Sequence, residues 1–110
     1  MPTDGVPVQE AGGALTPLSQ LSGGPKQDFT YKKISGLRMS GLSFRQSLFV
    51  GAIVENCHFV NTNFDRCDFA GAKVVRCTFD NCQFVPTEFR SCEITESKFN
   101  SCNFRGVQWL

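Results

Sequence analysis

The six cysteines are the residues best suited to chemistry in this chain of 110 residues. A thiolate binds zinc or joins a disulfide, and both uses need partner groups that converge on one point. Successive cysteines are 5 or 10 residues apart, and no Cys-x-x-Cys pair occurs. We therefore expect small, buried thiols that fill a core, with a metal site or disulfides as the alternatives. The cysteines are Cys57, Cys67, Cys77, Cys82, Cys92 and Cys102.

His58 is the one histidine of the sequence, and hence the one conventional general acid or base near neutral pH. No serine, aspartate or glutamate stands at a local spacing that would build a catalytic triad around it. The chain also has no glycine-rich phosphate loop that opens a helix. We expect His58 to be a solvated surface residue, and we expect a protein that is not an enzyme and holds no cofactor.

The charged residues nearly balance, with 11 Lys and Arg against 10 Asp and Glu. Binding to a phosphate backbone is driven by surplus positive charge, so nucleic acid is not an expected partner. The strongest basic run opens the repeats described below, and we expect it to be solvated and loosely paired. It consists of Lys26, Lys32, Lys33, Arg38 and Arg45.

Two features that direct a chain to a membrane are missing from the sequence. No stretch approaches the ~20 apolar residues that span a bilayer. The N-terminus lacks the basic and apolar regions of a secretory signal. We therefore expect a cytoplasmic protein without membrane contact.

Residues 1–26 are dense in Gly and Pro and contain no Phe, Tyr or Trp. Such a segment buries too little apolar surface to offset the entropy of ordering it, so we expect a flexible arm. Leu15, Leu18 and Leu21 recur every three residues, which leaves a short docking or capping turn as the alternative. The domain that positions the residues above is expected to span residues 27–110.

A large apolar residue stands at every fifth position from Phe29 to Trp109, and all 11 Phe fall in this central column. On an α-helix such residues would scatter around the axis, and on a flat strand alternate ones would face opposite sides. A chain that turns one corner in every five residues directs them all to a common axis. The column is Phe29, Ile34, Met39, Phe44, Phe49, Val54, Phe59, Phe64, Phe69, Val74, Phe79, Phe84, Phe89, Ile94, Phe99, Phe104 and Trp109.

A second column, two residues before the first, holds only small residues from Ser47 to Cys102 and includes all six cysteines. Two residues after the central residue, Gly or Asn is frequent, and these residues tolerate the positive φ of a type II turn. The central column repeats its β-branched residues at intervals of 20, which predicts four pentads per coil. We therefore expect a four-sided β-solenoid of about four coils. The β-branched residues are Ile34, Val54, Val74 and Ile94.

Three units resemble the pentapeptide-repeat family, whose pattern is a small residue, Asp or Asn, Leu or Phe, and two variable residues. They are Thr62-Asn63-Phe64, Cys67-Asp68-Phe69 and Cys102-Asn103-Phe104. The resemblance covers residues 27–110 and implies an all-β fold, a right-handed quadrilateral β-helix. Lys32, Leu37 and Leu42 depart from the small residue of the pattern.

The best-known activity of that family is the protection or inhibition of type II topoisomerases by dimers that look like acidic duplex nucleic acid. This chain departs from that pattern in its small size, its net charge of +1 and its lack of a C-terminal helix. We therefore expect a non-catalytic module that presents a rigid surface to another protein. A nucleic-acid-mimicking regulator or protector of a type II topoisomerase is the alternative.

Outward positions are mostly polar, but apolar residues break this rule around the segment SLFVGAIVEN. Contiguous exposed apolar residues often mark an interaction surface. We expect this surface to bind the unidentified partner protein, with coverage by the N-terminal arm as the alternative. Its residues are Leu48, Val50, Ile53, Ala70 and Val75.

The last coil is the second candidate interface. A terminal coil without a polar cap exposes strand edges and apolar side chains, which invite pairing with another chain. We expect this end to be buried against a partner or against a second copy in a C2 homodimer. The residues expected there are Phe99, Phe104, Trp109 and Leu110.

Pro86 replaces Gly or Asn at one corner of the repeat. The φ angle of proline is fixed at about −65°, so a type II turn cannot place it at the third position. The sequence therefore predicts a distorted corner between Phe84 and Phe89.

Overall fold

The repeats form two parallel sheets, and each coil adds one strand to each sheet. The computed structural model describes residues 10–11, 14–15, 24–107 and 109. The strands of the first sheet are β3 (Lys33–Ser35), β5 (Ile53–Glu55), β7 (Lys73–Val75) and β9 (Glu93–Thr95). Those of the second are β4 (Arg38–Ser40), β6 (His58–Val60), β8 (Thr78–Asp80) and β10 (Lys98–Asn100).

Neighbouring coils are offset by 20 residues on every face. In the sheets Ile34 pairs with Val54, and Phe59 pairs with Phe79. The other two faces are joined by isolated parallel bridges with the same offset, such as that between Leu48 and Asp68. Each face is named below after one central residue that it contains. The names are the Ile34 face, the Met39 face, the Phe44 face and the Phe29 face.

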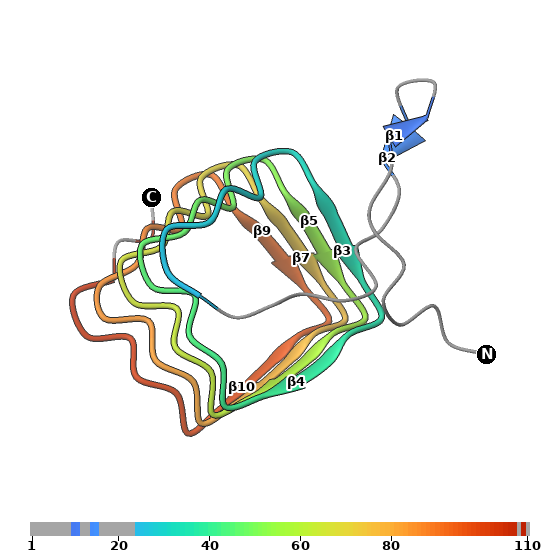
Figure 1. Cartoon of the computed structure of the whole chain (residues 1–110). Helices are drawn as coiled ribbons and strands as arrows, with labels where there is room; N and C mark the ends of the chain where they lie inside the picture. The colour runs from blue at the N-terminus through green and yellow to red at the C-terminus, as the bar shows by residue number, and fades with distance from the viewer. Residues whose placement is uncertain (1–9, 12–13, 16–23, 108, 110) are drawn as a thin grey trace.

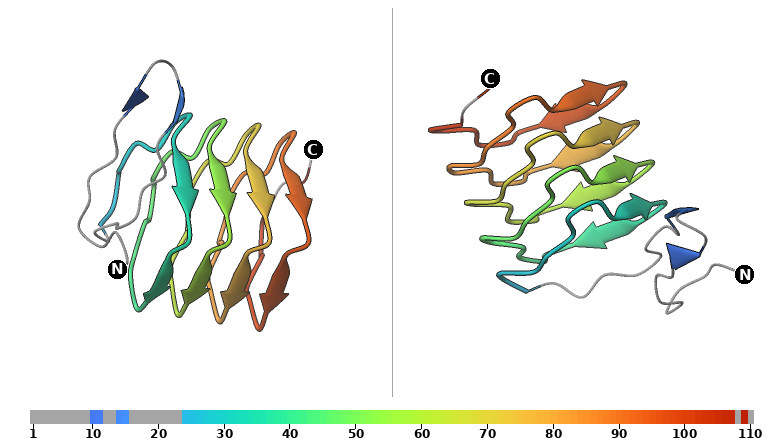
Figure 2. Two further views of the ribbon diagram at one scale, coloured as in Figure 1. Left: turned by 90° about the vertical axis from the view of Figure 1, so that its right-hand side faces the viewer. Right: turned by 90° about the horizontal axis from the view of Figure 1, so that it is seen from above.

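The four faces enclose a square tube, seen along its axis in Figure 1, and the coils lie side by side in Figure 2. In Figure 1 the chain turns clockwise as it moves away from the viewer, so the solenoid is right-handed. The expected quadrilateral β-helix is confirmed. None of the described residues forms a helix long and apolar enough to cross a membrane.

The central column fills the axis of the tube, as predicted. From Phe29 to Phe89 its members are buried, except for the half-buried Met39. Rings on one face stack along the axis, and the centroids of Phe49 and Phe69 are 4.6 Å apart with an interplanar angle of 3°. Rings on adjacent faces meet edge to face, which complements their quadrupoles. The result is one continuous aromatic core.

The first coil follows the same path although it carries larger residues at the small positions. Leu37 is buried in the core, and Leu42 packs against it half-buried. β3 and β4 keep the regular register with β5 and β6. The core therefore tolerates these departures from the repeat pattern.

The corners carry the positive φ angles that their sequence predicts. Every Gly or Asn expected there has a φ between 50° and 72°, or 76° at Gly106. Apart from the corner at Pro86, the described corners that follow the Phe29 and Phe44 faces close with the hydrogen bond of a type II turn, such as Ala52 N to Phe49 O at 3.1 Å. The residues with the expected positive φ are Gly36, Gly41, Gly51, Asn56, Asn61, Gly71, Asn81 and Gly106.

The corner at Pro86 is distorted, as predicted. The Val85–Pro86 peptide bond is cis, and Pro86 has no positive φ. Among the described backbone hydrogen bonds, none joins Thr87 to Phe84 across this corner. Instead the Val85 amide donates to the Asp65 carboxylate at 2.7 Å.

The predicted arm lies mostly outside the described residues, as do Leu18 and Leu21. Within it β1 (Glu10–Ala11) and β2 (Ala14–Leu15) pair in an antiparallel ladder. Among the described residues, the first backbone hydrogen bond to the repeats runs from Gly24 N to Ser43 O. The boundary between arm and solenoid stays a prediction.

Candidate protein-binding site

A groove of about 520 Å³ crosses the coils where the Phe29 face meets the Ile34 face. The groove follows a column of corner residues, because successive coils place equivalent residues above one another. We call it the corner groove. It is lined by Tyr31, Val50, Gly51, Ala70, Gly71, Arg90 and Ser91.

Tyr31 forms one end of the corner groove. It occupies a corner position with a φ of 60°, and 66% of its surface is exposed. Its ring lies against Gly51 of the next coil, where an added Cβ atom would collide with the Tyr31 ring. Gly51 thus supplies both a positive φ of 65° and the space for the ring.

The floor of the corner groove is apolar and its far end is cationic. Val50 and Ala70 are half-buried on successive coils. Arg90 is exposed on the following coil, and its guanidinium lies 3.4 Å from the Glu88 carboxylate. Arg90 is the charged member of the described lining. The groove therefore offers an aromatic ring, an apolar floor and a guanidinium in sequence along the axis.

The structure places the five predicted partner-surface residues in two groups. Val50 and Ala70 line the corner groove, and Leu48 is 42% exposed on the same Phe29 face. Ile53 in β5 and Val75 in β7 are half-buried on the Ile34 face and do not line the groove.

Sequence reasoning missed Tyr31 and Arg90 at this site. The signal for Tyr31 was an aromatic residue in a corner column that holds Gly51, Gly71 and Ser91 in the later coils. Arg90 carries no comparable signal, because many outward positions are charged. Only the offset of 20 residues between coils brings it into line with Val50 and Ala70.

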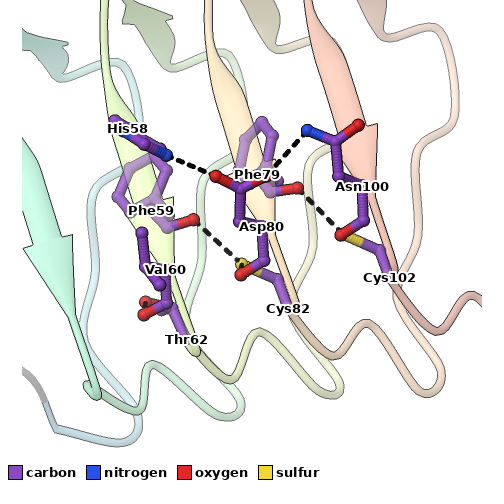
Figure 3. A network of polar contacts seen from close by, with 9 residues as sticks. All are labelled: His58, Phe59, Val60, Thr62, Phe79, Asp80, Cys82, Asn100 and Cys102. Atoms are coloured by element: carbon purple, nitrogen blue, oxygen red, sulfur yellow. Dashed lines mark hydrogen bonds and ion pairs between the residues drawn. The ribbon is translucent and has the colours of Figure 1, made fainter.

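His58 belongs to a polar ladder on the Met39 face, shown in Figure 3, and is not merely solvated as expected. Its Nε2 atom is 2.6 Å from Oδ2 of Asp80, and Asn100 Nδ2 donates to Oδ1 of the same carboxylate at 2.7 Å. The hydrogen bonds from Asn100 and from His58 hold the pKa of Asp80 below its ordinary value.

A hollow of about 160 Å³ lies beside His58 and is lined in part by Ser40. Among the described contacts, no hydrogen bond joins the Ser40 hydroxyl to the imidazole. The ladder orients the His58 ring toward Asp80 but presents no nucleophile in bonding contact with it.

The cysteines serve as packing residues, as predicted. Cys57, Cys67, Cys77 and Cys82 are buried and all six thiols are unpaired, with Cys92 and Cys102 half-buried. Thiols donate to the carbonyl of the central residue 23 positions earlier, as Cys82 does to Phe59 and Cys102 to Phe79 in Figure 3.

Burial shapes the acidity of these thiols. It raises the pKa of Cys67 and of Cys82 to about 12, and that of Cys92 to about 11. A contact with the Cys77 thiol, together with burial, raises the pKa of Cys57. The four thiols whose pKa is raised in this way are therefore poor nucleophiles near neutral pH.

The candidate end interface is partly exposed. Trp109 is 55% exposed and stacks on Phe89 at a centroid distance of 4.8 Å. Phe99 and Phe104 are half-buried, and Leu110 lies outside the described residues. Burial of this end against a second copy stays a prediction.

Comparison with known proteins gave one family match. A model of pentapeptide repeats, with eight copies, matches residues 43–81 and 67–106. A search of curated proteins found no match.

The solved structures that are similar to this chain include two that differ in their biological setting. One is HetL from the cyanobacterium Nostoc sp. strain PCC 7120, a pentapeptide repeat protein involved in heterocyst differentiation regulation. It is 10% identical, with a TM-score of 0.51, and the match covers 73% of this chain and 48% of HetL. The other is QnrB1, a plasmid-mediated fluoroquinolone resistance protein. It is 21% identical, with a TM-score of 0.42, and the match covers 76% of this chain and 48% of QnrB1. This chain thus spans about half the length of either protein, and the likeness to HetL concerns the fold alone.

Proposed function

Since the chain belongs to the pentapeptide-repeat family, we propose that it is a protein-binding module whose binding surface is the corner groove with the adjoining Leu48. Proteins of this family are generally non-enzymatic structural or binding modules. A module of this kind acts by holding a partner in a defined position.

The observation that carries the proposal is the exposed ring of Tyr31 beside the apolar floor of Val50 and Ala70. The large aromatic side chain of Tyr31 is 66% exposed, and Leu48, on the Phe29 face that leads into this corner, is 42% exposed. Contiguous exposed apolar surface of this kind is typical of protein interaction sites. Aromatic and arginine side chains are enriched in such sites, and the groove contains both.

The stacked core makes this surface rigid. Phe49 and Phe69 lie on the inner side of the Phe29 face, and only 2% of the surface of each is exposed. A preformed surface loses little conformational entropy on binding, which favours affinity.

The test is photo-crosslinking in a lysate of the source organism, with p-benzoylphenylalanine in place of Leu48. We expect a discrete crosslinked partner that is lost in the Val50→Glu variant. Val60→Glu is the matched control, because Val60 is also half-buried and also follows a central Phe, but on the Met39 face. Equal crosslinking in both variants would show that the corner groove is not the binding surface.

Regulation of a type II topoisomerase is the second reading, and a supercoiling assay with the purified protein tests it. Mimicry of duplex nucleic acid requires an acidic surface, whereas this chain has 11 basic and 10 acidic residues. We therefore expect no effect on supercoiling at micromolar protein.

A further inference from the structure

We propose that the corner groove recognises a short, extended, acidic segment of the partner protein, in which an apolar side chain and a carboxylate lie two to four residues apart. The inference rests on the proposed function and adds the chemistry of the partner.

The length of the groove sets the length of the segment. The groove runs from Tyr31 in the first coil to Arg90 and Ser91 in the fourth. Three steps between coils, each about 4.8 Å, give about 14 Å. An extended chain rises about 3.3 Å per residue, so about four residues span the groove.

The backbone of the groove is already paired from coil to coil. Tyr31 N donates to Val50 O at 2.9 Å, Gly51 N to Ala70 O at 2.9 Å, and Gly71 N to Arg90 O at 2.8 Å. These groups are therefore not free to extend a sheet with a strand of the partner. The proposed recognition therefore uses side chains.

The middle of the groove is open for an apolar side chain. The ring of Tyr31 covers Gly51, but no atom lies within 4 Å of the position that a Cβ atom on Gly71 would occupy. Ala70 and Val50 border this open position. An apolar side chain of the partner lying there would pack beside the Tyr31 ring and cover the floor.

Arg90 supplies the charge that selects an acidic partner. Its guanidinium makes one 3.4 Å contact with Glu88, and both side chains are about half exposed. Such surface ion pairs contribute only about 0–1 kcal/mol, so Glu88 does not hold the guanidinium in place. The planar guanidinium pairs favourably with a carboxylate through two hydrogen bonds. Since Arg90 lies one coil beyond Gly71 along the groove, the acid of the partner is separated from its apolar residue along the segment.

The experiment uses an array of hexapeptides probed with the labelled full-length protein. Each peptide has Leu, Met, Phe or Tyr and, two to four positions away in either direction, Asp or Glu, and each has partner peptides with Lys or Gln in place of the acid. We expect the acidic peptides to bind at least about tenfold more strongly than their Lys partners. Arg90→Glu should abolish that binding and favour the Lys peptides, and Tyr31→Ala should weaken it.

Arg105→Glu is the matched control and should bind like the unaltered protein. Arg105 is exposed and follows a central Phe by one residue, as Arg90 does, but lies on the Phe44 face. Thermal melting of each variant shows whether it is folded.

Three results would overturn the proposal. In the first, the acidic, Lys and Gln peptides bind equally, or Arg90→Glu still prefers the acidic ones. In the second, peptides bind only to a variant with Asp4→Asn and Glu10→Gln, which would make the chain's own acidic N-terminal segment the occupant. In the third, Val50→Glu abolishes a dimer seen by sedimentation, which would make a second copy the occupant. If the array fails while Val50→Glu still abolishes crosslinking, the peptide chemistry is wrong and the proposed function stands.

Discussion

The Thr87 hydroxyl donates a 2.6 Å hydrogen bond to the Phe64 carbonyl of the preceding coil. Elsewhere in the solenoid thiols make the equivalent contact, as Cys67 does to Phe44 at 3.0 Å. Thr87 follows directly on Pro86, where the backbone turn is distorted and its hydrogen bond is missing from the described set. The hydroxyl thus ties two coils together beside their most irregular corner.

Thr87→Val is expected to lower the free energy of unfolding by about 1 kcal/mol, because a buried donor is lost with little change in shape. Thr87→Cys should lower the free energy of unfolding by less than Thr87→Val does, since a thiol donates at the same position in other coils. Urea denaturation measures both. Equal stability of all three proteins would mean that the hydrogen bond contributes nothing net.

Phe69→Ala is expected to lower the free energy of unfolding by about 3 to 5 kcal/mol. The ring is 2% exposed and stacks between Phe49 and Phe89, at centroid distances of 4.6 and 5.1 Å. Its removal leaves a cavity in the middle of the aromatic core. Denaturant melting gives the loss, and Lys73→Ala, at an exposed position of β7, is the control, expected to change stability by less than about 0.5 kcal/mol. A loss below about 1 kcal/mol would contradict a packed inward column.

Gly51→Ala is expected to destabilise the protein more than Gly71→Ala does. Both glycines have a positive φ, 65° and 70°, so each substitution carries the backbone cost of about 1–2 kcal/mol. Only at Gly51 would the added Cβ atom collide with the Tyr31 ring. The Tyr31→Ala background provides the check, because there the two substitutions should become equal.

Stability is expected to fall as the pH rises from about 9 toward 12. The thiols of Cys67 and Cys82 have an ordinary pKa of 9.0, raised in the folded protein to about 12. Below pH 9 they are protonated in both states, so their contribution is fully present. Above it the unfolded chain releases the protons first, which favours unfolding. Urea melts between pH 8 and 11 measure the slope, and a double Cys67→Ala, Cys82→Ala variant should show a smaller one.

Self-association through the last described coil is expected at micromolar concentration. Trp109 is 55% exposed over Phe89, and the half-buried Phe99 and Phe104 adjoin it. Pairing with a second copy would cover this apolar surface. Sedimentation should detect a dimer that Trp109→Ser weakens. A monomer with the emission of a fully solvated tryptophan would refute the prediction.

The sequence determined the fold more completely than it determined the site. The period of five residues places Phe64 and Phe69 on adjacent faces, and the interval of 20 places Val54 under Val74, because both follow from counting along the chain. The corner groove was harder to foresee. The position of the Tyr31 ring depends on the absence of a side chain at Gly51, one coil away.

The His58 ladder escaped prediction for a related reason. Its partner Asp80 lies 22 residues along the chain, which is one coil and two strand positions away. A search for local triad spacings could not find that pair. In a solenoid, polar partners are found at the coil interval and its near neighbours.

The offset of 20 residues also determines which changes of length the molecule tolerates. Duplication of residues 44–63 would insert a whole coil, lengthen the tube by about 4.8 Å and leave every later residue on its original face. Insertion of a single pentad would instead rotate all later residues by a quarter turn about the axis. Arg90 would then move to the next face while Tyr31 stayed in place. Surfaces that span several coils can therefore be lengthened only in steps of a complete coil.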